Sequence, residues 1–134
     1  MQMIEEQQSI RKKVVIVCIN ISVALAHFPT GPNYTGPFPA FVNGFLLDIL
    51  IPFAWYFLLV LAEHNIKPLH PWYVKSALVF AAASGVEIAQ FFGVPLFGRT
   101  FDPLDFVMYA SGGILAAIFD RILFPKVFKF WKTG

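Results

Sequence analysis

The sequence predicts an all-α membrane protein, a polytopic bundle of four transmembrane helices. The chain has 134 residues, of which 57% are hydrophobic and 13% are charged. Soluble domains carry roughly 25% charged residues, so this chain has about half the usual charge. Four apolar stretches account for most of the length, and we expect a single domain over residues 1–134. A net charge of +2 is too small to indicate a nucleic-acid partner.

The first predicted span covers residues 14–28, between a basic run that ends at Lys13 and Pro29. It is short for a span, but the stems of flanking lysines can lie along it while their ammonium groups stay among the lipid headgroups. The alternative is a cleaved secretory signal with residues 24–26, Ala-Leu-Ala, as the cleavage site. The sequence leaves both open, and the orientation of the other spans is the same in either case.

The remaining spans are predicted at residues 41–62, 73–92 and 106–124, each close to the length that a bilayer demands. The segment 29–40 before them is rich in proline and glycine, which disfavour helix and favour turns. Pro52 lies inside the second span. Because proline has no N–H and crowds the carbonyl four residues earlier, we expect a kink there.

Small residues predict which spans pack closely, because helices in lipid approach one another where side chains are small. The third span has Ala81, Gly85 and Ala89 at four-residue spacing, and the fourth has Gly112 and Gly113. We therefore expect the third and fourth spans to be packed partners through these residues.

Basic residues predict the orientation. If the first span starts inside, nine of the ten Lys and Arg residues lie on the inner side and Arg99 alone lies outside. This imbalance follows the positive-inside rule and places both termini in the cytoplasm. The tail 125–134 combines lysines with Phe130 and Trp131, which predicts a segment on the membrane surface that contacts anionic lipid; a plain stop-transfer flank is the alternative.

Polar residues converge on the outer half of the predicted bundle. They are Asp48, Glu87, Gln90, Arg99, Asp102 and Asp105. At 1.5 Å per residue, Asp48 and Glu87 lie roughly 7–10 Å below the outer boundary, and Gln90 shares a helical face with Glu87. Carboxylates within a span are costly, so each is a candidate functional residue.

These residue types suggest defined roles. Arg99 can hold a phosphate or carboxylate through two parallel hydrogen bonds, and a carboxyl group that keeps its proton near neutrality can transfer it to a substrate. We therefore assign Glu87 and Asp105 as candidate catalytic residues, and Arg99, Gln90, Asp102 and Asp48 as candidate binding residues. The structural alternatives are a helix cap at Asp102, before Pro103, and a Glu87–Arg99 pair that fixes the loop.

No metal-ligand spacing, glycine-rich phosphate loop or nucleophile set occurs, so we predict neither a metal nor a cofactor. The single cysteine, Cys18, excludes an intramolecular disulfide. On the inner side, the pattern of Glu63, His64 and His70 is typical of solvated side chains, and we expect Asp120 to be paired or solvated.

The spacing of the polar residues resembles the VanZ-like family of small multipass membrane proteins. The matching positions are Glu87-x-x-Gln90, Arg99, Asp102, Asp105 and the final glycines Gly112–Gly113, within residues 80–120. One departure is Tyr109–Ala110, where the family often places an asparagine. The resemblance implies the bacterial cytoplasmic membrane and an association with resistance to the glycopeptide teicoplanin, without implying a particular reaction.

Two functions follow as hypotheses. In the first, the outward site binds or modifies a lipid-linked envelope precursor or another anionic molecule, with membrane lipids around the bundle; the sequence leaves open whether a reaction occurs. In the second, the chain is an accessory or assembly subunit of a larger membrane complex. A proton pathway is disfavoured, because the inner halves of the predicted spans hold no carboxylate to continue one apart from Asp120, which lies next to Arg121 at the inner interface.

Overall fold

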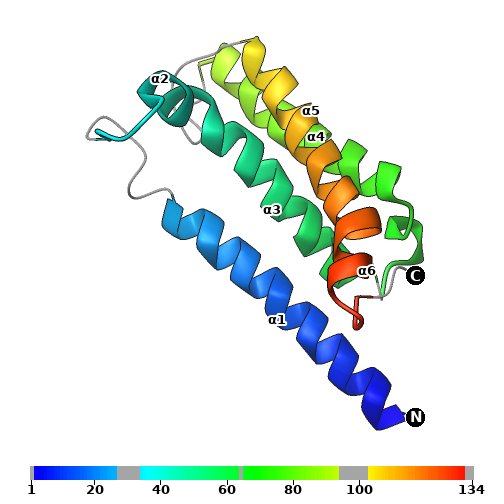
Figure 1. The fold of residues 1–134 in the computed structure, drawn as a ribbon. Coiled ribbons are helices and arrows are strands. Elements are labelled where there is room, and N and C mark those ends of the chain that lie inside the picture. The colour runs from blue at the N-terminus through cyan, green and yellow to red at the C-terminus, as the bar shows by residue number, and fades with distance from the viewer. Residues whose placement is uncertain (1, 27–33, 64, 94–102, 132–134) are drawn as a thin grey trace.

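The computed structural model describes residues 2–26, 34–63, 65–93 and 103–131, and all regular structure within these ranges is helical. The α-helices are α1 (Gln2–Ala26), α2 (Pro39–Phe41), α3 (Leu47–Ala62), α4 (Trp72–Phe91), α5 (Leu104–Ile118) and α6 (Phe124–Val127). Figure 1 shows α1 along one side of the molecule, next to α3, with α4 and α5 beyond α3. The all-helical fold class is confirmed.

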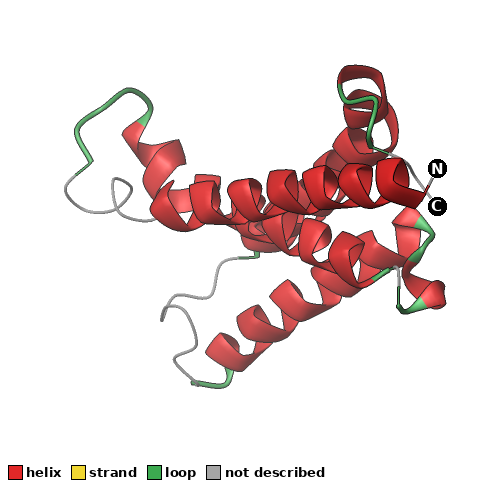
Figure 2. Ribbon diagram, turned by 90° about the horizontal axis from the view of Figure 1, so that it is seen from below, coloured by secondary structure: helices red, strands yellow, loops and turns green. Residues whose placement is uncertain are grey.

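Single turns of other helix types complete these elements. A π-helical turn, Val42–Leu46, joins α2 to α3, and a second, Phe119–Leu123, joins α5 to α6. A 3₁₀ turn at Lys67–Leu69 precedes α4. Figure 2 shows the resulting long helical rods and their connecting loops.

Helix boundaries agree with the predicted spans except at the N-terminus. Continuous helix covers residues 39–62, 72–91 and 104–127. By contrast, α1 begins at Gln2, well before the predicted start at residue 14. Residues 2–13 are rich in Gln, Glu, Lys and Ile, which favour or tolerate helix, so the helix continues beyond the apolar stretch. Residues 27 and 28 of the predicted first span lie outside the described residues.

Length and composition allow two helices to cross a membrane. They are Trp72–Phe91 and the continuous run Leu104–Val127, while Leu47–Ala62 is apolar but shorter. A bilayer core of about 30 Å needs roughly 20 helical residues. These two helices are weak evidence for a membrane protein, and four spans stay a prediction.

The core is centred on α3, which packs against α1, α4 and α5. Its aromatic side chains Phe53, Tyr56 and Phe57 are buried, and the rings of Phe53 and Phe57 meet edge to face at 5.1 Å. From α1, Ile16 joins the same cluster. The helix is continuous through Pro52, and the kink expected there stays a prediction.

The glycines of α5 lie at two different helix contacts. A Cβ atom at Gly112 would overlap the backbone carbonyl oxygen of Ile49 in α3, so only glycine permits this approach. Gly113 faces α4, where the Ser76 hydroxyl donates a hydrogen bond of 3.0 Å to the Gly113 carbonyl. The predicted packing of the third and fourth spans is therefore confirmed.

The predicted contact face of α4 is wrong. Ala81 is exposed, and a Cβ at Gly85 would meet no atom within 4 Å. Instead Ala83 and Glu87 point into the bundle. At 3.6 residues per turn, Ala81 lies on the opposite side of the helix from Ala83. Burial of Ala83 and Glu87 therefore turns Ala81 and Gly85 outward.

Candidate functional site

A carboxylate from α4 and a phenol from α5 meet inside the bundle. Glu87 is 1% exposed, and the Tyr109 hydroxyl donates a hydrogen bond of 3.0 Å to its Oε2 atom. Tyr109 is also buried, one helical turn after Asp105. This bond joins the end of α4 to the beginning of α5.

Two more carboxylates lie within electrostatic range of the same phenol. Asp105 is buried near the start of α5, and Asp48 is half-buried near the start of α3. Electrostatic interactions link the Tyr109 hydroxyl to Asp48, Glu87 and Asp105. We name these four residues the Tyr109 cluster. Three helices thus place carboxylates around one phenol.

The other predicted site residues divide into two groups. Gln90 is half-buried one turn after Glu87, on the α4 face that also carries the buried Ser84. Arg99 and Asp102 lie outside the described residues. The helix α5 begins at Leu104, and the predicted cap at Asp102 likewise falls outside them. The structure therefore brings together Asp48, Glu87 and Asp105.

Chemically, the Tyr109 cluster combines acceptors with one positioned donor. Three carboxylates in a poorly hydrated place attract a cationic group, and a carboxyl beside a phenol can exchange a proton with a bound molecule. Sequence reasoning named Tyr109 as a departure from the resembled family and did not include it in the site. Its phenol makes a polar contact at the position where the resembled family often has asparagine.

A second polar cluster lies at the opposite end of α4. Lys75 is 0% exposed, and its ammonium donates to Glu63 Oε2 at 2.6 Å and to the carbonyl oxygens of Leu69 and His70 at 3.0 and 2.9 Å. These three acceptors use all three ammonium donors. The buried lysine is therefore fully satisfied.

Asp120 is the other buried carboxylate of this region and is 1% exposed. It accepts hydrogen bonds from the Tyr56 hydroxyl at 2.8 Å and from the Trp131 indole at 2.9 Å. The Arg121 Nε atom lies 3.4 Å from Oδ2, and Lys75 Nζ lies 4.0 Å away. The expected pairing of Asp120 is confirmed. We name Tyr56, Glu63, Lys75, Asp120, Arg121 and Trp131 the Lys75 cluster.

Two expectations for this end are wrong. Glu63 was expected to be solvated, yet it is buried against Lys75 and lies 3.7 Å from Lys12 Nζ. Trp131 was expected among the lipid headgroups, yet it is 2% exposed and its ring lies 5.8 Å from that of Phe57. Buried carboxylates require donors, and the indole N–H meets this need at Asp120.

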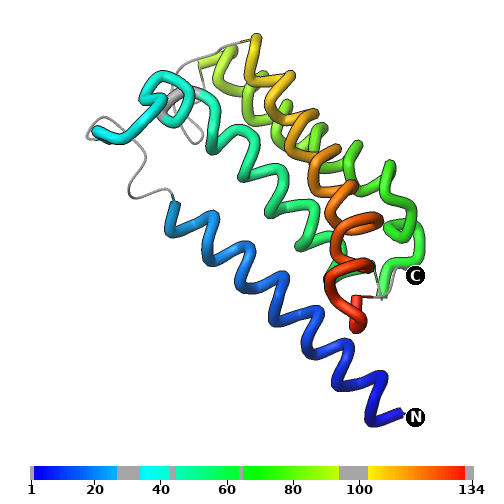
Figure 3. Tube along the Cα trace, viewed as in Figure 1, coloured from blue at the N-terminus to red at the C-terminus, as the bar shows by residue number. Residues whose placement is uncertain are grey.

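The C-terminal segment returns to α1. Figure 3 shows it beside the N-terminal helix, where Lys12 Nζ lies 4.9 Å from the centre of the Trp131 ring. Burial lowers the pKa of the Lys12 ammonium, and the carboxylates of Glu63 and Asp120 oppose that shift. Lys126 and Lys129 are exposed, and residues 132–134 of the predicted tail lie outside the described residues.

Sequence reasoning missed the Lys75 cluster, although one signal was present. Lys75 falls within the predicted third span, and a lysine at such a position needs an acidic partner. It was counted only as an inner-side positive charge. Its partner Glu63 lies beyond the end of another predicted span, so periodicity within either helix does not join them.

Comparisons with protein-family models, curated proteins and solved structures give no match. The resemblance to the VanZ-like family therefore stays a prediction. Among the described residues, no group of three or more His, Cys, Asp or Glu side chains is arranged to hold a metal ion.

Proposed function

We propose that this chain is a multi-pass protein of the bacterial cytoplasmic membrane with the Tyr109 cluster near the outer face. In this proposal the four spans are those predicted from the sequence, residues 14–28, 41–62, 73–92 and 106–124. Two of these helices have the length and composition for the role. Apolar side chains on the surface of the bundle, including Ile21, Ile88 and Ile114, suit contact with acyl chains.

The proposed function is to bind or modify a lipid-linked or anionic molecule of the envelope. The observation that carries it is the gathering of Asp48, Glu87 and Asp105 around Tyr109, with Glu87 almost fully buried. Buried carboxylates are costly, and a hydrophobic contact between α4 and α5 would hold the helices together without that cost. The cost is explained if the carboxylates exchange a proton with the ligand or bind a basic group of it, while Arg99 binds its anionic part.

The proposed roles follow the residue chemistry. Arg99, from the loop between α4 and α5, binds the phosphate or carboxylate of the ligand with its planar guanidinium. Gln90, Asp102 and Asp48 bind polar groups of the same ligand. If the protein catalyses a reaction, Glu87 and Asp105 transfer the protons. The teicoplanin association of the resembled family belongs to this proposal as an expectation.

The test is to identify what copurifies with the protein. The wild type and the Arg99→Lys variant are purified in mild detergent, and bound small molecules are identified by mass spectrometry. We expect the wild type to enrich an anionic lipid-linked molecule, and Arg99→Lys to retain at least about tenfold less, because lysine lacks the fork that binds two oxygens at once.

Lys67→Gln is the control, since Lys67 is exposed in the loop before α4. It should retain as much ligand as the wild type. Equal retention by Arg99→Lys would contradict the role of Arg99. A stoichiometric protein partner without any enriched small molecule would instead favour the accessory-subunit hypothesis.

A further inference from the structure

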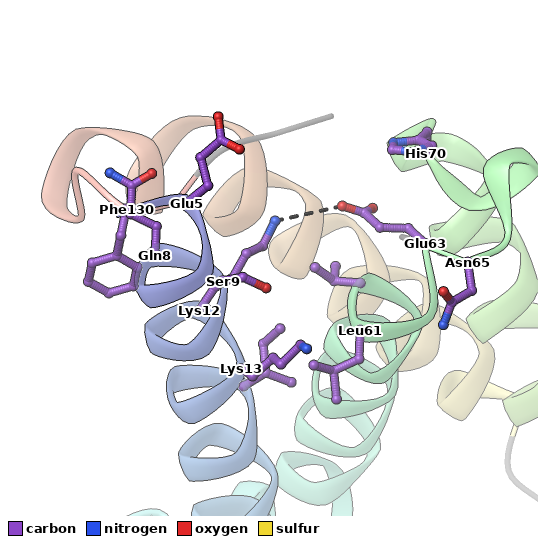
Figure 4. Close-up of a pocket in the computed structure, with 12 residues that line it drawn as sticks. Glu5, Gln8, Ser9, Lys12, Lys13, Leu61, Glu63, Asn65, His70 and Phe130 are labelled. Atoms are coloured by element: carbon purple, nitrogen blue, oxygen red, sulfur yellow. Dashed lines mark ion pairs between the residues drawn. The ribbon is translucent and has the colours of Figure 1, made fainter. Parts of the chain in front are cut away.

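A cavity of about 370 Å³ lies between the first half of α1 and the end of α3, away from the Tyr109 cluster. Its lining includes Ser9, Lys12 and Lys13 of α1, together with Val60 and Glu63 from the other wall. Figure 4 shows Lys12 and Glu63 facing each other across this space. Its volume is within the range of small-ligand pockets, roughly 300–1,000 Å³.

The cavity is polar at one end and apolar at the other. On α1, Ile16 follows Lys12 by one turn, or about 6 Å along the axis. On α3, Val60 precedes Glu63 by three residues, and Figure 1 shows the two helices running in opposite directions. Ile16 and Val60 therefore lie on the same side of the polar residues, toward the middle of the bundle. Both are buried in the core, so the apolar surface that an amphiphile can contact is the exposed side of α1 one turn after Lys13, at Val17.

The charges at the polar end favour an anion. Lys12 and Lys13 line the cavity, as do the carboxylates of Glu5 and Glu63. The ammonium of Lys75 lies 2.6 Å from Glu63 Oε2 and offsets one of these carboxylates. Lys75 is buried behind Glu63 and does not line the cavity, so the ammonium groups of Lys12 and Lys13 face one lining carboxylate, Glu5, that Lys75 does not offset. Lys13 forms no ion pair within the described part of the chain.

Two polar atoms of the lining lack a partner. Gln8 Oε1 and His70 Nδ1 are buried and make no hydrogen bond with any described residue. A buried acceptor without a donor is costly, so such atoms indicate a missing polar group. A ligand with hydroxyl groups as well as a phosphate would provide donors for these atoms and acceptors for the lysines.

We propose that this cavity binds the phosphoglycerol headgroup of an inner-leaflet phosphatidylglycerol. The phosphate contacts Lys13 and Lys12, the glycerol hydroxyls donate to Gln8 and His70, and an acyl chain follows the exposed side of α1 at Val17. Phosphatidylglycerol joins an anionic phosphate, hydroxyl donors and an apolar tail, the three properties that the cavity presents. The inference rests on the proposed membrane orientation, and it is independent of any ligand at the Tyr109 cluster.

Native mass spectrometry of the full chain in detergent tests the proposal. The protein is titrated with phosphatidylglycerol or phosphatidylcholine of the same acyl chains, and the bound lipid is counted. We expect tighter binding of phosphatidylglycerol. Lys13→Gln should weaken that binding at least about tenfold, the effect of losing one hydrogen bond from a charged group.

Arg11→Gln is the matched control, because Arg11 is an exposed neighbour that loses the same charge and does not line the cavity. It should bind phosphatidylglycerol like the wild type. Equal binding of the two lipids, or equal weakening by both variants, would overturn the proposal, since either indicates diffuse attraction.

A competition experiment separates the lipid from its free headgroup. Glycerol phosphate should displace phosphatidylglycerol only at far higher concentration, because it lacks the acyl chain that contacts Val17. Displacement at similar concentrations would overturn the lipid as occupant. The outer-site proposal is tested separately, by the amount of ligand that Arg99→Lys retains, so each proposal can fail without the other.

Discussion

Buried charges in this protein are satisfied by donors and acceptors from distant segments. Lys75 and Asp120 both lie inside the bundle, and their partners come from α3, the loop before α4 and the C-terminal segment. Removing one member of a buried pair leaves an uncompensated charge, whereas replacing both can be nearly neutral. The stability of this end of the molecule therefore depends on a few side chains acting together.

Lys75→Met tests this dependence at the scale of one residue. It removes the 2.6 Å ion pair with Glu63 and the two bonds to backbone carbonyls. We expect the free energy of unfolding in detergent micelles to fall by about 3–5 kcal/mol. Adding Glu63→Gln should recover part of the loss. Lys67→Met, at an exposed site, is the control, and equal stability of the two methionine variants would contradict the argument.

The positions of the helices along the chain could be predicted from the sequence more completely than the face that each helix turns inward. Runs of apolar residues of bilayer length located α3, α4 and α5 to within a few residues, because length and hydropathy are local properties. The inward face of α4 depends instead on where Glu87 finds Tyr109, a contact between two helices. The small residues Ala81 and Gly85 gave no information about that contact, so the predicted face was wrong.

The candidate site was likewise predictable only where a property could be read along a single helix. Asp48, Glu87 and Asp105 were predicted together because their depths could be counted along each helix. The Lys75 cluster could not be, since Glu63 and Trp131 were assigned to loops and surface. Nothing in the local pattern around Trp131 indicates that the chain turns back to place its indole at Asp120.

Helix packing gives a prediction at the scale of the element. Gly112→Ala places a methyl group into the Ile49 carbonyl of α3, so α3 and α5 must separate. We expect a loss of about 1–3 kcal/mol in the free energy of unfolding. Gly113→Ala meets Ser76 at 3.5 Å, an ordinary contact, and should cost little.

Gly85→Ala is the second comparison, because the added methyl group meets nothing within 4 Å. Alanine favours helix over glycine by about 1 kcal/mol, so this variant should be at least as stable as the wild type. Denaturation of all three variants under the same conditions measures the order. Equal changes in the free energy of unfolding at positions 85, 112 and 113 would contradict the argument that the close approach of the α3 and α5 backbones requires glycine at position 112.

At the scale of the whole molecule, the Lys75 cluster and the Tyr109 cluster lie at opposite ends, and the distribution of basic residues gives these ends an orientation. The Lys75 cluster lies where α3 ends and α4 begins, and the Tyr109 cluster lies where α4 ends and α5 begins. If the bundle crosses a membrane, these clusters lie near opposite surfaces. The positive-inside rule then places the Lys75 cluster on the cytoplasmic side, together with the cavity between α1 and α3.

Cysteine labelling in intact cells tests this orientation. In a Cys18→Ala background, we expect Thr35→Cys, in the segment before α2, to react with a membrane-impermeant maleimide added outside. Ile66→Cys, in the loop before α4, should react only after permeabilisation. Both positions are exposed, so a difference reports the side of the membrane and not burial. The reverse pattern would place the Lys75 cluster outside. Labelling of both sites in intact cells would mean that the run 39–62, whose apolar helix Leu47–Ala62 is shorter than the two candidate spans, does not cross the membrane.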